Sequence, residues 1–81
     1  MDTRAQLGQL TARELGVLRC MAEGLSNTGI GQRLHLSAKT VEVHVGAIFS
    51  KLGLYPDTTD NRRVMAVVIW LHQSRPAEFA A

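Results

Sequence analysis

The segment 38–52 carries side chains that suit contact with a nucleic acid. At about 100° per residue, one face of this segment as a helix is apolar and must be core; it consists of Val41, Val45, Ile48 and Leu52, with Phe49 beside it. The opposite face holds small or weakly charged residues: Lys39, Val43, Gly46 and Ser50, flanked by Glu42 and Ala47. Small residues permit close approach, and an exposed valine can contact a thymine methyl group. This face fits the major groove of DNA, although periodicity alone equally allows a merely solvated face.

One edge of the same segment is polar along its length, with Thr40, His44 and Lys51. Hydroxyl, imidazole and ammonium groups are suited to phosphate oxygens, which fix the register of a protein on DNA without specifying a sequence. The segment therefore combines a face for bases with an edge for the backbone.

Capping residues predict the helices that would position this segment. Thr11 and Glu14 form a capping box, while Ser26 and Ser37 are N-cap candidates for the next two helices. Glycines able to adopt the left-handed conformation follow two of the helices, at positions 24 and 53. The expected helices are 12–23, about 26–34, 38–52 and about 60–72.

No stretch alternates apolar and polar residues as a half-buried strand would, so the fold class is all-α. A short helix, a turn of three or four residues and a longer capped helix form a helix-turn-helix. The expected fold is a four-helix bundle that contains this unit.

Composition limits the other possibilities. The chain has 81 residues, a net charge of +2 and one cysteine, Cys20, which fits a reducing cytoplasm and a small partly buried side chain better than a redox role. No apolar run is long enough to cross a bilayer, and no signal peptide is recognisable. The three histidines lack metal-ligand spacing, so we expect no metal and no cofactor. No nucleophile accompanies a base in a catalytic motif, so we expect no enzyme.

The run LTARELGVLRCMAEGLSNTGIGQRLHLSAKTVEVHVGAIFSKLGL resembles the DNA-binding domain of the LuxR/GerE family, which is also found in response regulators of the NarL/FixJ type. The resemblance rests on LT-x-RE, AEGLSN, LS-x-KTV-x-VHV and KLGL taken together, and it covers most of the chain. It implies a four-helix bundle that controls transcription at promoter DNA. It implies base-reading roles for Glu42, Val43 and Gly46, and phosphate contacts for Lys39, Thr40, His44 and Lys51.

The chain departs from the family pattern at several positions. Glu42 and Gly46 stand where many members carry lysine or another polar residue, which changes the bases that would be read. Gly29 and Gly31 replace the usual Glu-Ile-Ala pattern around Ile30, so we expect the helix at 26–34 to be the least stable one.

The last helix is apolar on two sides. Val64, Val67, Val68 and Leu71 are expected to seal it onto the core, which leaves a second surface for a dimer interface: Met65, Ala66, Ile69 and Trp70. The resemblance implies pairing through this helix, and so an inverted repeat as the DNA site. The alternative is that Met65 and Trp70 fold back onto the chain termini. Arg62 and Arg63 are open to either phosphate contact or solvent.

These observations favour sequence-specific binding of double-stranded promoter DNA and transcriptional regulation. The chain would be the cytoplasmic effector domain of a two-component response regulator, with RNA polymerase as a further partner; a stand-alone regulator of the GerE kind is the other arrangement. The rival functions are a sigma-factor-like helix-turn-helix and a helical protein-interaction module without DNA contact. We expect a linker or disordered segment over 1–9, the domain over 10–73 and a frayed tail over 74–81.

Overall fold

The computed structural model describes residues 7–56 and 61–74, and this part of the chain is helical without strands. It contains α2 (Ala12–Ala22), α3 (Asn27–Leu34), α4 (Ala38–Lys51) and α5 (Arg62–Ser74). The all-α class and the helix-turn-helix order are confirmed. The last helix begins at Arg62, later than the sequence predicts, and the expected start near residue 60 lies outside the described residues, as do 1–6 and 75–81.

The predicted caps are present. The Thr11 hydroxyl accepts a hydrogen bond from the backbone N–H of Glu14 at 3.1 Å, and Glu14 Oε1 accepts one from the backbone N–H of Thr11 at 2.9 Å. Ser26 and Ser37 cap α3 and α4 through their side-chain oxygens. Gly24 and Gly53 have φ angles of 90° and 73°, the left-handed conformation in which a side chain would be strained.

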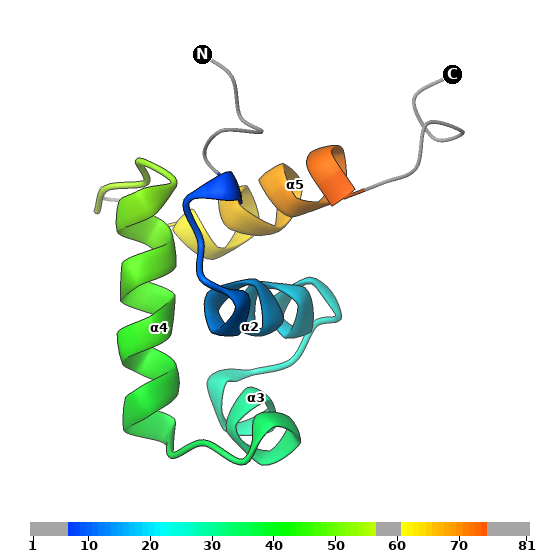
Figure 1. Cartoon of the computed structure of the whole chain (residues 1–81), viewed down its shortest axis with the longest axis vertical. Coiled ribbons are helices and arrows are strands. Elements are labelled where there is room, and N and C mark those ends of the chain that lie inside the picture. The colour runs from blue at the N-terminus through cyan, green and yellow to red at the C-terminus, as the bar shows by residue number, and fades with distance from the viewer. Residues whose placement is uncertain (1–6, 57–60, 75–81) are drawn as a thin grey trace.

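Helix α2 lies at the centre of the domain. It contacts α3, α4 and α5, and Figure 1 shows these three helices arranged around it, with α4 upright along one side. The fully buried residues come from all four helices and the ends of their loops; the largest are Leu18, Ile30, Ile48, Leu52, Val17 and Val41. Leu7 also packs against this core, so the packed part of the chain includes residues before Leu10.

The faces of α5 differ from the sequence prediction. Ala66 is completely buried, so it cannot belong to the free surface assigned to it, whereas Ile69 and Trp70 are partly buried and pack against the core. The exposed apolar side chains are instead Val64, Met65, Val68 and Leu71. The error has a physical cause: a helix that is apolar all round presents two stripes of similar hydrophobicity, and periodicity cannot say which one meets the core.

Among the described residues, no helix has the length and apolarity needed to span a bilayer. Over the same ranges, no cluster of three or more His, Cys, Asp or Glu side chains is arranged to hold a metal ion.

Candidate nucleic-acid interface

Helix α4 is anchored through one face and open on the other. Val41, Val45 and Ile48 are buried against the rest of the domain, as the sequence predicts. In Figure 1 the other helices all lie on one side of α4. Its opposite side is left uncovered by the described part of the chain, so a long helical surface is available to a partner.

Three residues expected to read bases share this open surface. Glu42, Val43 and Gly46 are all exposed, and at about 100° per residue they fall within a single arc of the helix. Val43 is 61% exposed, although exposing an apolar side chain to water is unfavourable in free energy. A Cβ atom at Gly46 would meet no other atom within 4 Å, so the backbone can be approached closely there. The surface therefore offers a hydrogen-bond acceptor at Glu42, a methyl-bearing side chain at Val43 and room for close approach at Gly46.

The residues expected to contact phosphate divide into two groups. Lys39 and Thr40 lie in the first turn of α4, and the half-buried His44 follows one turn later. Ser37 Oγ donates to Thr40 Oγ1 at 2.9 Å and accepts from the Thr40 backbone N–H at 3.1 Å. The Thr40 hydroxyl proton is therefore left to donate to an acceptor such as a phosphate oxygen.

Lys51 lies at the other end of α4 and has a partner within the protein. It lies twelve positions after Lys39, a distance of about 18 Å along a helix. Its Nζ lies 2.8 Å from Oε1 of Glu14, whose residue is only 6% exposed. Burial raises the pKa of the Glu14 carboxyl, but hydrogen bonds from Lys51 and from the Thr11 backbone outweigh this, and the net pKa is lowered. Lys51 therefore neutralises a buried carboxylate and holds α4 against α2.

The connection between α3 and α4 is a tight turn. His35 adopts a left-handed conformation with φ of 59°, and the N–H of Leu36 donates to the Gly31 carbonyl at 2.8 Å. A Cβ atom at Gly31 would lie 2.6 Å from the Leu36 carbonyl oxygen, closer than real Cβ contacts allow. Glycine at this position permits the close approach of the turn to α3, a role that the sequence interpretation missed.

The two arginines that open α5 are engaged within the domain. The Arg62 guanidinium lies over the Phe49 ring, 4.8 Å from its centroid. Arg63 donates to the Leu25 carbonyl and to the side chain of Asn27. Sequence periodicity gave no signal for these contacts, since each joins residues that are far apart along the chain.

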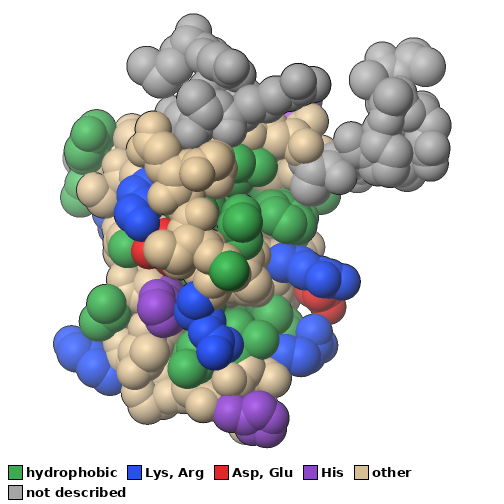
Figure 2. Space-filling model, viewed as in Figure 1, with side chains coloured by type: hydrophobic (Ala, Val, Ile, Leu, Met, Phe, Trp, Pro, Cys, Tyr) green, Lys and Arg blue, Asp and Glu red, His purple; other side chains and the backbone are tan. Residues whose placement is uncertain are grey.

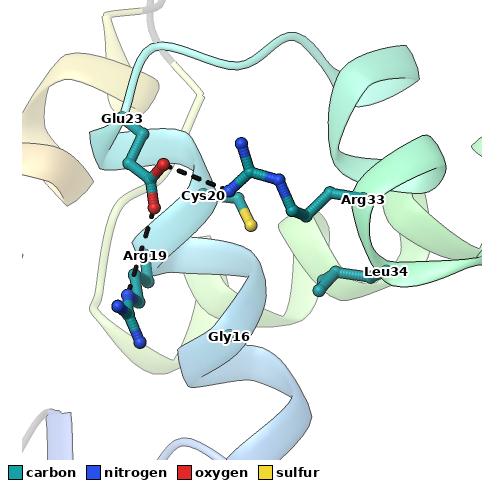
Figure 3. Close-up of a pocket in the computed structure, with 6 residues that line it drawn as sticks. All are labelled: Gly16, Arg19, Cys20, Glu23, Arg33 and Leu34. Carbon is teal, nitrogen blue, oxygen red and sulfur yellow. Dashed lines mark hydrogen bonds and ion pairs between the residues drawn. The ribbon is translucent and has the colours of Figure 1, made fainter.

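A shallow groove between α2 and α3 has no connection with the open surface of α4. Cys20 contributes to its wall, and Glu23 joins Arg33 at 3.1 Å and Arg19 at 4.0 Å across its rim (Figure 3). Its volume of about 220 Å³ falls below the 300–1,000 Å³ typical of small-molecule sites, so we assign no ligand to it.

A second exposed surface lies on α5. We call Val64, Met65, Val68 and Leu71 the α5 apolar surface; they recur at helical spacing and all remain exposed. Figure 2 shows hydrophobic side chains over several parts of this face, with Lys and Arg side chains between them and few acidic atoms. A row of exposed aliphatic side chains of this kind is characteristic of a protein contact.

Comparison with known proteins gives one family and several relatives. Residues 8–68 match the model of the GerE family, described as bacterial regulatory proteins of the luxR family. The chain is 42% identical over 69 residues to a nitrate/nitrite response regulator protein homolog of Haemophilus influenzae, covering 85% of this chain and 30% of the relative. It is 40% identical over 73 residues to the nitrate/nitrite response regulator protein NarL of Escherichia coli, covering 90% and 31%. It is 41% identical over 68 residues to the transcriptional regulatory protein DegU of Brevibacillus brevis, covering 84% and 26%. No solved structure gives a significant match.

Proposed function

Because the chain belongs to the luxR family of bacterial regulatory proteins and is a DNA-binding domain for transcription regulation, we propose that it reads a specific duplex sequence with α4 in the major groove. The observation that carries this proposal is the open surface of α4, where Glu42, Val43 and Gly46 share one arc. In a helix-turn-helix the second helix enters the groove and the first crosses the DNA backbone. Here α4 and α3 would take these two roles.

Each side chain in the arc has a distinct task in this proposal. Val43 packs against a thymine methyl group, Glu42 accepts a hydrogen bond from cytosine N4, and Gly46 lets the helix backbone approach the base edges. Lys39, Thr40 and His44 contact phosphates along the polar edge. Lys51 adds positive charge near the far end of α4, while its ammonium group remains shared with Glu14.

The domain would bind as a symmetric dimer through the α5 apolar surface. Burying Val64, Met65, Val68 and Leu71 against the same residues of a second copy removes them from water in a two-fold arrangement. Two α4 helices would then face adjacent major grooves of an inverted repeat, about one helical turn apart. Joining two half-sites in one complex also compensates for the few positive charges on each copy.

The chain spans only 30% and 31% of the length of the two nitrate/nitrite relatives. A role for this domain within a whole response regulator is therefore proposed separately from DNA binding. By analogy with these response regulators, the domain would be the output module of a cytoplasmic two-component system and would contact RNA polymerase. An upstream signal would then control its access to promoter DNA.

The test is selection of bound duplexes from a random pool, followed by binding curves at two salt concentrations. We expect one enriched motif and an affinity that falls with salt, since DNA binding releases counterions. Val43→Ala and Glu42→Ala should each shift the enriched motif by about 1–3 kcal/mol of discrimination at one base pair. Gln32→Ala, an exposed position on α3 away from this arc, is the control and should select the parent motif. Variants of Val43 and Glu42 that both enrich the parent motif would refute the base-reading assignment.

A further inference from the structure

Arg63 joins the start of α5 to the start of α3. Its Nη1 donates to the Asn27 side-chain oxygen at 2.9 Å, and its Nη2 donates to the Leu25 carbonyl at 2.6 Å. Leu25 lies in the loop between α2 and α3, and Asn27 is the first residue of α3. One planar guanidinium therefore holds both the loop and the helix that follows it.

Helix α3 has few other restraints at this end. It is eight residues long, it has no acidic residue in its first turn, and its N-cap is a single hydrogen bond from Gly29 N–H to Ser26 Oγ at 3.1 Å. Gly29 further lowers its intrinsic stability. A short helix of this composition depends on tertiary contacts for its orientation, and the fork of an arginine fixes two acceptors in a defined geometry.

We propose that Arg63 is a positioning residue for DNA binding, which sets the orientation of α3 relative to α5. The proposal rests on the proposed function, in which α3 crosses the DNA backbone and α5 carries the dimer contact. Arg63 would thereby fix the position of the helix-turn-helix relative to the α5 apolar surface. Both of its acceptors lie within the protein, so it acts through α3 and not by contact with a phosphate.

The experiment compares Arg63→Met with Arg62→Met. Both remove one positive charge from the first turn of α5, but the Arg62 guanidinium lies over the Phe49 ring of α4, whereas Arg63 donates to Leu25 and Asn27. The probe is a duplex with one half-site of the parent's selected motif, at a temperature where circular dichroism shows every variant to be fully folded. We expect Arg63→Met to raise the half-site Kd about tenfold, since hydrogen bonds to a charged group are among the stronger ones, and Arg62→Met to raise it less.

Two further readouts separate positioning from charge. The salt dependence of binding should keep its slope in Arg63→Met, because a lost phosphate contact would reduce the slope by about one. Amide hydrogen exchange without DNA should become faster at Asn27–Leu34 in this variant and stay unchanged in the middle of α4. Arg63→Lys, which keeps the charge but not the fork, should recover only part of the affinity.

The outcomes are distinguishable. A parent that selects no DNA site would overturn the proposed function, and this inference with it. A parent that binds DNA would leave the proposed function standing while any of three results overturns the inference alone. The first is a half-site Kd of Arg63→Met equal to that of the parent. The second is an equal rise in the half-site Kd for Arg63→Met and Arg62→Met. The third is a half-site Kd of Arg63→Lys equal to that of the parent.

Discussion

Lys51 Nζ lies 2.8 Å from Glu14 Oε1, and this ion pair joins the last turn of α4 to the first turn of α2. The same carboxylate also accepts from the backbone N–H of Thr11, so it completes the cap of α2. Glu14 thus links the local start of α2 to the placement of α4, the helix proposed to face DNA. Such a pair is costly to break from one side, because the remaining charge is left with little water around it.

The first prediction concerns the pH dependence of folding. The pKa of Glu14 is lower in the folded protein than the ordinary pKa of a glutamate, so the unfolded chain binds more protons and stability rises with pH in this region. The contribution of Glu14 is fully present above about pH 5 and is lost as the pH falls through the folded-state pKa. Glu14→Gln should lower the free energy of unfolding at pH 7 by about 1.5–3 kcal/mol.

The measurement is urea denaturation of the parent and Glu14→Gln at pH 7 and pH 3.5. The difference in the free energy of unfolding between the two proteins should shrink at the lower pH, since pH 3.5 lies below the ordinary pKa of a glutamate and the unfolded parent then takes up a proton there. Glu23→Gln is the matched control, because Glu23 pairs with arginines on the surface and should cost about 0–1 kcal/mol. If Glu14→Gln lowers the free energy of unfolding by the same amount at both pH values, the stabilising role of the ionised Glu14 carboxylate is wrong.

The second prediction separates the two lysines of α4. Lys39→Ala should weaken binding to all duplexes alike and leave the melting temperature nearly unchanged, since Lys39 is exposed. Lys51→Ala should weaken binding and also lower the melting temperature, since it leaves the Glu14 carboxylate unpaired. The checks are thermal melts and fluorescence anisotropy with matched and scrambled duplexes. Arg19→Ala, an exposed arginine on α2, controls for loss of charge alone; an Arg19 effect on DNA equal to that of Lys39 would contradict the phosphate role.

Local signals in the sequence were sufficient for most of the fold. The structure confirms three short-range features: the capping box of α2, the two left-handed glycines, and the buried stripe of Val41, Val45 and Ile48. The roles of Lys51 and Arg63 depend on partners more than thirty residues away, which no periodicity contains. The orientation of α5 was predicted wrongly because hydrophobicity was similar on two sides of the helix. The base-reading and phosphate assignments stay predictions, because they concern contacts with DNA and not contacts within the chain.

The third prediction compares two glycines of the same short helix. Gly29→Ala should raise the free energy of unfolding by up to about 1 kcal/mol, because a Cβ there would make only ordinary contacts, the nearest at 3.5 Å with Leu25. Gly31→Ala gains the same helix propensity but places its Cβ 2.6 Å from the Leu36 carbonyl oxygen. We expect a net loss of about 1–3 kcal/mol, the usual cost of overpacking. Urea denaturation of both variants is the measurement, and equal stabilities would show that the turn after α3 can shift freely.

The last prediction concerns the α5 apolar surface. Val68 is 38% exposed, whereas Ile69 beside it packs against the core. Val68→Glu should therefore keep the helical content and melting temperature of the parent but prevent dimer formation, since it places a charge within a contact that would otherwise be apolar. Ile69→Glu should instead destabilise the fold, so it cannot report on the interface. Sedimentation with and without a palindromic duplex would measure the stoichiometry of each variant. Ala12→Glu, which adds the same charge at an exposed position in the first turn of α2, should still form two-to-one complexes with the palindrome. If the parent itself binds the palindrome only as a monomer, then α5 does not pair two copies and the proposed dimer is wrong.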